Sequence, residues 1–176
     1  TSASSIRSNR ADLLDTLAHE FFHVWNVERI RPRALEPFDL ENANMSGELW
    51  LAEGFTSYYG PLISLRSGVT QLRDFVSEMG FVVNRVQTSS GRSLRSAEDM
   101  SRLAPLVDAA TSTDRTVFDN AYLSYYTWGA AIGLGLDLTL RDRTKGKVTL
   151  DTYMRALWQT HGKPGGKVPG YVDRPY

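Results

Sequence analysis

Residues 19–23 read His-Glu-Phe-Phe-His, and the interpretation of the whole chain starts from this segment. On an α-helix, residues i and i+4 lie on the same face, so His19 and His23 can both point at one metal ion. Glu20, beside the first histidine, is then placed to accept a proton from a water molecule on that ion. The segment therefore predicts two metal ligands and a base on one helical turn. The third and last histidine, His161, stands among glycines and a proline and is expected to be an exposed loop residue.

A helix is expected to carry this segment, from Arg10 to about Val27. Its apolar residues surround most of the helix, which is typical of a helix buried inside a domain. They are Leu13, Leu14, Leu17, Phe21, Phe22, Val24, Trp25 and Val27. Buried histidine and glutamate side chains need partners, and a metal ion would serve all three of them. Asp15, one turn before His19, either orients that imidazole or is a solvent-facing acid near the start of the helix.

Capping and breaking signals predict the other elements. Further helices are expected at about 48–59, ended or kinked by Gly60-Pro61, from a Thr70 cap to about Val86, from Ser96, and from about 149 to 160. Loops are expected at 31–47 and 109–120, and the tail 162–176 has no evident structure. Residues 126–141 are ambiguous, because their alternating leucines favour a strand while a helical stripe fits as well.

Composition limits the class of protein. The 176 residues suffice for one domain with a hydrophobic core, and 41% of them are hydrophobic. Acidic and basic residues balance at 20 each, and no apolar run is long enough to span a membrane. We therefore expect neither a nucleic-acid partner nor a membrane partner. The chain has no cysteine, so a metal site must use imidazole and carboxylate ligands. Nothing in the sequence indicates a compartment.

A third protein ligand is needed, because catalytic zinc sites usually have three and leave one position for water. Glu28 follows His23 by five residues and points away from the shared face. The acids of the 31–47 loop are held less firmly. Glu53 is expected on a second helix among large apolar neighbours, where a carboxylate needs a countercharge. Glu53 is therefore the preferred candidate.

These residues together resemble a known family. His-Glu-Phe-Phe-His followed by Leu-Trp-Leu-Ala-Glu-Gly-Phe at 49–55 is similar to the gluzincin metallopeptidases, which pair HExxH with a glutamate on a second helix; the aminopeptidase N family is a more distant relative. The runs His-Val-Trp-Asn at 23–26, Arg-Ile-Arg-Pro at 29–32 and Glu-Gly-Phe-Thr-Ser-Tyr-Tyr at 53–59 are closer to the glycyl aminopeptidase family. The long spacer between His23 and Glu53 agrees with that family.

The resemblance implies a fold, a cofactor and an activity. The fold would be mainly α, the helical part of a thermolysin-like zincin domain, with residues 126–141 helical. The protein would be a zinc aminopeptidase that removes small amino-terminal residues, glycine especially, from peptides. Zinc would be held by His19, His23 and Glu53, with Glu20 as general base. A tyrosine in a Tyr-x-Lys-Gly pattern would bind the oxyanion; Tyr126 matches, although Trp128 replaces the lysine, and Tyr125 is the alternative.

The same resemblance implies that a β-rich segment precedes the HExxH helix. We therefore expect residues 1–176 to be a single domain that is a fragment of a larger catalytic domain, with flanking domains as partners. An alternative is a non-catalytic zinc-binding structural fragment that needs this segment for activity. A third hypothesis is a hydrolase of another bond, since some relatives of aminopeptidase N open epoxides.

Overall fold

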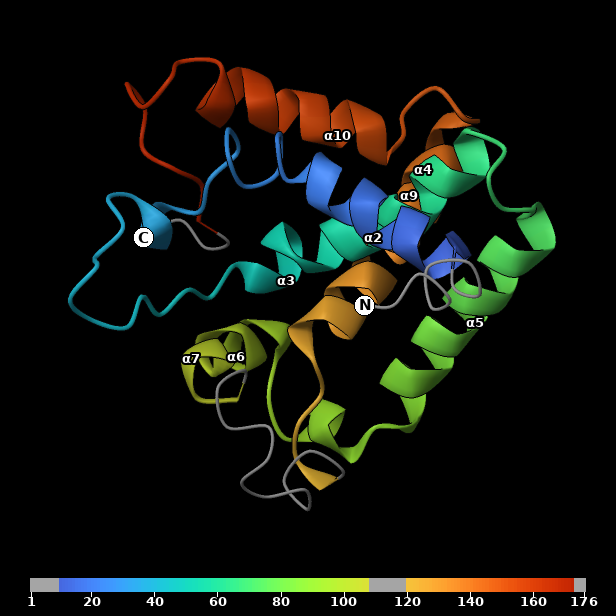
Figure 1. Ribbon diagram of the computed structural model, residues 1–176, viewed down its shortest axis with the longest axis horizontal. Helices are drawn as coiled ribbons and strands as arrows, with labels where there is room; N and C mark the ends of the chain where they lie inside the picture. The colour runs from blue at the N-terminus through green and yellow to red at the C-terminus, as the bar shows by residue number, and fades with distance from the viewer. Residues whose placement is uncertain (1–9, 108–119, 173–176) are drawn as a thin grey trace.

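The computed structural model describes residues 10–107 and 120–172, and across these ranges the chain is mainly helical with almost no strand (Figure 1). This confirms the prediction of a mainly α fold. The α-helices are α2 (Arg10–Phe22), α3 (Leu49–Ala52), α4 (Gly54–Arg66), α5 (Leu72–Thr88), α6 (Ala97–Arg102), α7 (Ala104–Val107), α9 (Tyr125–Thr144) and α10 (Leu150–Leu157). Shorter turns are η1 (Arg33–Leu35), η2 (Ser90–Ser93) and the π-helical η3 (Trp158–Gly162). None of the described helices is both long and apolar enough to cross a membrane.

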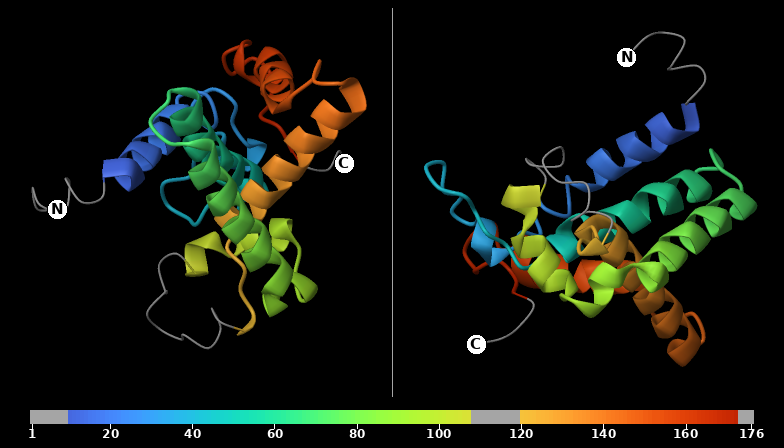
Figure 2. Two further views of the ribbon diagram at one scale, coloured as in Figure 1. Left: turned by 90° about the vertical axis from the view of Figure 1, so that its right-hand side faces the viewer. Right: turned by 90° about the horizontal axis from the view of Figure 1, so that it is seen from below.

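Helix α4 lies at the centre of the fold. It packs most extensively against α9 and α2, and α5 packs against both α4 and α9. Figure 2 (right) shows α2 and α4 running side by side, with α5 beyond α4. The segment with the first two predicted ligands is therefore held against the helix that follows the third.

Two glycines bring α4 and α9 into backbone contact. A Cβ atom on Gly129 would lie 1.9 Å from the carbonyl oxygen of Trp50, and one on Gly54 would lie 2.3 Å from the Cα atom of Gly129. No side chain fits in either place, so only glycine lets the two backbones approach this closely. Since Gly54 directly follows Glu53, this contact sets the distance between Glu53 and the start of α9.

Two clusters of buried side chains form the core. The larger joins α4 to α9, α10 and the segments around Ile30 and Tyr171, with Phe55, Tyr58 and Leu150 among its members. The smaller joins α5, α6 and the start of α9. Trp50 of α3 packs against both clusters. The short helix α3 is thereby fixed on two sides just before Glu53.

A buried carboxylate joins α9 to its neighbours. Asp137 accepts hydrogen bonds from the Tyr58 hydroxyl at 2.8 Å, from Arg141 Nε at 3.0 Å and from the Leu150 backbone N–H at 2.7 Å. Burial opposes its ionisation, but these three donors outweigh that effect and lower the pKa of Asp137. The last bond satisfies a free N–H at the start of α10, so Asp137 fixes where α10 begins.

The prediction of a buried helix at 10–27 is wrong in two respects. Helix α2 ends at Phe22, and residues 23–29 continue as turns. The side chains of Leu17 and Phe21 are 62% and 68% exposed. Only the face of α2 toward α4 is covered by the described residues, and apolar residues around the whole helix do not reveal which face that is.

Of the two outcomes expected at Gly60-Pro61, an end or a kink, the end is wrong, because α4 continues through both residues to Arg66. Pro61 lacks the N–H that would bond Ser57 four residues earlier, and the helix tolerates this loss. A Cβ atom at Gly60 would lie 3.1 Å from the Asp15 carbonyl oxygen and 3.5 Å from His19 Cβ. Gly60 therefore serves the contact with α2. The chain is interrupted instead at Glu53, between α3 and α4.

The remaining predictions have mixed outcomes. Residues 125–144 form one helix, α9, so the alternating leucines do not mark a strand. Helix α6 begins at Ser96 with a capping box to Asp99, as predicted, whereas Gln71 rather than Thr70 precedes α5. The predicted loop at 109–120 lies, except for Asn120, outside the described residues.

The tail was predicted to lack structure, but part of it is anchored. The Tyr171 N–H donates to the Arg31 carbonyl at 3.1 Å, and the Arg33 N–H donates to the Tyr171 carbonyl at 2.9 Å. His161, predicted to be a loop residue, lies in η3 with its Nδ1 atom 3.0 Å from the Pro169 carbonyl oxygen. The Tyr171 ring is buried in the larger core cluster. Backbone pairing to a distant segment leaves no periodic signal in a sequence.

Replacing Gly129 with alanine should destabilise the fold severely. The new methyl group would meet backbone atoms that cannot move aside, so we expect a loss of about 3 kcal/mol or more in the free energy of unfolding. Gly135→Ala in the same helix is the matched control, because a Cβ atom there meets nothing within 4 Å. It should stabilise the protein by up to about 1 kcal/mol. Denaturant unfolding of both variants measures the difference, and equal stabilities would contradict the close contact.

Candidate metal centre

His19, His23 and Glu53 come together although 29 residues (24–52) separate the last two. The two Nε2 atoms of the histidines lie 3.1 Å apart. Glu53 Oε2 lies 3.4 Å from His19 Nε2 and 3.2 Å from His23 Nε2. The two histidines come from the end of α2 and the turn after it, and Glu53 comes from the break between α3 and α4.

This triangle of atoms fits a tetrahedral zinc ion. Ligand atoms about 2.0–2.1 Å from a tetrahedral ion lie about 3.3 Å from one another. All three observed separations are close to that value, so one ion can reach the three atoms at normal bond lengths. Two imidazoles and a carboxylate are also a usual zinc ligand set. Among the described residues, this is the group of three histidine, aspartate or glutamate side chains that could hold a metal ion.

A hydrogen bond to the backbone orients the His23 ring. Its Nδ1 atom lies 2.6 Å from the carbonyl oxygen of Asn26. A carbonyl only accepts, so Nδ1 carries the proton and Nε2 of the neutral ring presents a lone pair toward Glu53. A lone pair facing a carboxylate at 3.2 Å is repelled unless a positive charge lies between them. A metal ion supplies that charge, and the bond to Asn26 sets the tautomer that ligation requires.

The pKa shifts show the same need for positive charge. Burial opposes ionisation of Glu53, but hydrogen bonds from His19 and His23 outweigh it and lower the pKa of Glu53 to about 2. The hydrogen bond to Glu53 is the main reason that the pKa of His23 is raised. Glu53 is therefore a carboxylate at neutral pH. Hydrogen bonds from the two imidazoles stabilise that carboxylate.

The predicted general base lies next to the triad. Glu20 follows His19 directly and is exposed to solvent. Its negative charge contributes to the raised pKa of His23. A solvent-exposed carboxylate beside the ligands is free to approach a water molecule at the site.

The two candidate tyrosines differ in where they face. The Tyr126 ring is stacked near His19, with centroids 6.3 Å apart and an interplanar angle of 25°, and the residue is 37% exposed. Tyr125 is 2% exposed and belongs to the smaller core cluster. Tyr126 is thus the tyrosine on the side of the metal ligands.

Asp15 does not act as a clear partner of His19. Its Oδ1 atom is buried and has no hydrogen-bond partner. The role proposed for it as an orienting group therefore stays a prediction. Analysis of the sequence missed the glycine pair at 54 and 129, and only the Glu-Gly and Trp-Gly dipeptides mark those positions.

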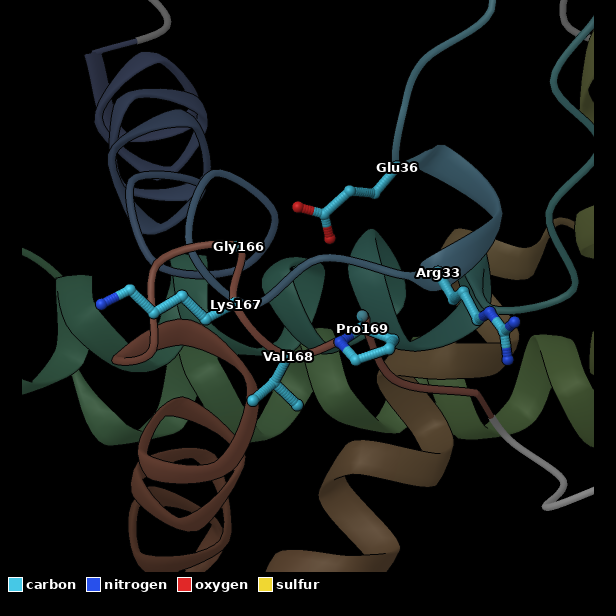
Figure 3. Close-up of a pocket in the computed structure, with 7 residues that line it drawn as sticks. Arg33, Glu36, Gly166, Lys167, Val168 and Pro169 are labelled. Carbon is cyan, nitrogen blue, oxygen red and sulfur yellow. The ribbon is translucent and has the colours of Figure 1, made fainter.

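Two surface clefts lie away from the triad. One is formed by η1 and the tail and is lined by Arg33, Glu36 and residues 166–170 (Figure 3). A second shares Glu36 with it and extends to Glu28, Arg31 and His161. Neither cleft includes a residue of the triad, and both mix acidic with basic side chains. We therefore place the candidate chemistry at the triad.

Comparison with known proteins identifies the family. Residues 12–132, more than half of the chain, match the family model for M61 glycyl aminopeptidase. The chain belongs to this family. The matched range contains His19, Glu20, His23, Glu53 and Tyr126. No curated protein matches the chain.

A solved structure supports the M61 assignment and the fold. The crystal structure of an aminopeptidase N family protein from Idiomarina loihiensis is similar, with a TM-score of 0.83 and 32% sequence identity. The match covers 91% of this chain and 27% of that protein. The M61 chain thus spans about a quarter of the length of its structural neighbour, and the fold agrees with the helical part of a zincin-like aminopeptidase.

Removing the Glu53 carboxylate should weaken zinc binding on the order of 100-fold or more, because one of three protein ligands is lost. Competition with a chelator of known affinity would measure the Kd of zinc for Glu53→Ala in the full-length protein. Glu28→Ala is the matched control, since Glu28 is an exposed acid outside the triad. Its zinc affinity should equal that of the wild type. Unchanged affinity in Glu53→Ala would show that another group is the third ligand.

Proposed function

We propose that this chain holds the zinc site of an aminopeptidase that hydrolyses the first peptide bond of substrates with small amino-terminal residues such as glycine. The convergence of His19, His23 and Glu53 within the span that matches the M61 family carries this proposal. The preference for glycine is supported by the description of that family. The substrate is a peptide with a free amino terminus, the flanking chain of the full-length protein is a partner, and no nucleic acid or membrane takes part.

Each residue of the site has a separate role in hydrolysis. His19, His23 and Glu53 hold zinc, which would lower the pKa of a water ligand toward about 7 and polarise the scissile carbonyl. Glu20 accepts a proton from the attacking water as its oxygen forms a bond to the carbonyl carbon. Glu20 then delivers this proton to the amide nitrogen as the C–N bond breaks. The products are a free amino acid and a peptide shortened by one residue.

Tyr126 stabilises the negative charge that develops on the carbonyl oxygen. Its ring lies beside His19, and its hydroxyl can donate one hydrogen bond to that oxygen. In the related family pattern a lysine stands two residues after this tyrosine, where this chain has Trp128. Tyr126 therefore acts without a cation at that position.

A second candidate is a zinc-binding fragment that has no activity by itself. The observation in its favour is that the chain corresponds to 27% of its structural neighbour. Residues 1–176 and the full-length protein, both supplied with zinc, can be compared with a chromogenic glycyl amide as substrate. Hydrolysis by both supports a self-sufficient site, hydrolysis by the full-length protein alone supports the fragment hypothesis, and an epoxide substrate tests the third hypothesis in the same assay.

Glu20→Gln should separate metal binding from catalysis. The amide keeps the shape of the side chain but cannot accept the proton, so we expect kcat to fall by about 10²–10⁴-fold. Zinc content, measured by atomic absorption, should equal that of the wild type because Glu20 is not a ligand. Glu28→Gln is the control for the same change at an exposed position. A variant that keeps its kcat would remove Glu20 from the mechanism.

Tyr126→Phe should lower kcat by about 10²-fold with little change in KM, since the lost hydrogen bond forms only as charge develops on the oxygen. Tyr125→Phe provides the neighbouring comparison, and its kcat should stay close to the wild-type value. Steady-state kinetics with the glycyl substrate measures both variants. If kcat falls in Tyr125→Phe alone, the oxyanion role belongs to Tyr125.

A further inference from the structure

Asn26 is a fully buried polar residue in the turns that follow α2. Its amide nitrogen, which carries two hydrogens, lies within hydrogen-bond distance of three acceptors, the carbonyl oxygens of Leu51 at 3.1 Å and Ala52 at 3.0 Å and the Thr56 hydroxyl at 3.1 Å. The Thr56 hydroxyl itself donates to the Ala52 carbonyl at 2.6 Å. One side chain thus reaches from the segment of His23 to the backbone just before Glu53.

These acceptors are groups that the helix interruption leaves in need of partners. Helix α3 ends at Ala52, and the last carbonyls of a helix lack partners within it. The Asn26 amide donates to two of these carbonyls, which directly precede Glu53. The Asn26 amide also contacts the hydroxyl of Thr56, which lies in the first turn of α4. The backbone before Glu53 and the Thr56 side chain after it are therefore bonded to a single group.

The backbone of Asn26 acts on the other metal ligand. Its carbonyl oxygen accepts the hydrogen bond from His23 Nδ1 at 2.6 Å, which orients that ring. Asn26 thus contacts His23 through its main chain and the Glu53 segment through its side chain.

We propose that Asn26 is a positioning residue that fixes His23 and Glu53 relative to each other so that one zinc ion can bind both. This inference rests on the proposed function, because it takes the triad to be the zinc site. Asn26 touches neither substrate nor metal and acts through the two ligands.

The chemistry of the buried amide supports this role over simple packing. The Asn26 Oδ1 atom is buried and has no hydrogen-bond partner. An apolar side chain would avoid the cost of burying that oxygen. The three acceptors also determine which end of the amide faces them, since a rotated amide would place its oxygen against three oxygens. Only a hydrogen-bond donor at position 26 can pair with the carbonyl oxygens that precede Glu53.

The sharpest test is Asn26→Asp, which keeps the shape of the side chain and removes the donor. The Kd for zinc, from chelator competition in the full-length protein, should rise by about 10–100-fold, as for other groups that orient metal ligands. The absorption spectrum of the Co²⁺-substituted protein should change as well, because it reports ligand geometry. Asn26→Ala should have the same effect.

Ser101→Ala is the matched control. Ser101 is also fully buried, and its hydroxyl accepts a bond from the Trp50 N–H at 2.9 Å and donates to the Ala97 carbonyl at 2.8 Å. It holds α3 at the far end from Glu53 and contacts no ligand. This variant should unfold at a lower temperature, yet its zinc affinity and Co²⁺ spectrum should match the wild type. An equal loss of zinc affinity in Ser101→Ala would reduce the role of Asn26 to general stability and overturn the proposal.

Thr56→Val is a second test of the proposal, for use if the Asn26 variants do not fold. It removes one acceptor of the Asn26 amide while preserving the branched shape. The Kd for zinc should rise, as in Asn26→Asp, but by a smaller factor. Wild-type affinity and an unchanged Co²⁺ spectrum in Thr56→Val, or in a folded Asn26→Asp protein, would overturn the inference alone. A wild-type protein that binds no zinc would overturn the proposed function with it.

Discussion

The backbone contact between Gly54 and Gly129 is the constraint on which the arrangement of the site depends. It joins the start of α4 to the first turns of α9 with no side chain between them. Glu53 immediately precedes one glycine, and Tyr126 stands three residues before the other. The carboxylate of the triad and the proposed oxyanion donor are thus placed by the same contact. A bulkier residue at either position would separate these two groups, because the helix backbones themselves would have to move apart.

The second contact of α4, with α2, completes the site. Gly60 lets the two helices approach at Asp15 and His19, one turn and a half beyond the Gly54 contact. Helix α4 therefore meets one helix that carries ligands and another that carries Tyr126. The negative charge of Glu53 and the lone pairs of two imidazoles then converge on a small volume. Such an arrangement is unfavourable unless positive charge or hydrogen-bond donors lie between these groups. Hydrogen bonds from His19 and His23 lower the pKa of Glu53.

Membership in the M61 family agrees with the chemistry of this arrangement. Neither of the two surface clefts includes a member of the triad. The anchored tail contributes none either, although its Tyr171 is buried in the same core as Phe55 of α4. The chain corresponds to about a quarter of its structural neighbour, and within that share it contains the candidate ligands His19, His23 and Glu53 together with Glu20 and Tyr126.

The predictions that the structure supports rest on the spacing of residues along a single helix. His19 lies in the last turn of α2 and His23 directly follows the helix, where its N–H still bonds the His19 carbonyl at 3.3 Å. The four-residue spacing therefore keeps both side chains together, and the capping box at Ser96 and Asp99 is equally local. The resemblance to the family supported Glu53, which its apolar neighbours already favoured, and added Tyr126 and a helix at 126–141. Reasoning from periodicity alone left that helix ambiguous, because Gly133 and Gly135 between leucines imitate the alternation of a strand while Gly133 in fact faces Phe55.

The sequence by itself thus determined the chemical groups and their order along each helix. Only the tertiary structure decided which face of α2 is buried, that the chain is interrupted at Glu53 and not at Gly60-Pro61, and that Tyr126 rather than Tyr125 lies beside His19. It also revealed the bonds from Asn26 to both ligand segments. The reason is physical. Spacing along one helix follows from backbone geometry, whereas the distance between two helices depends on which backbones can touch, and that is known only when both are in place.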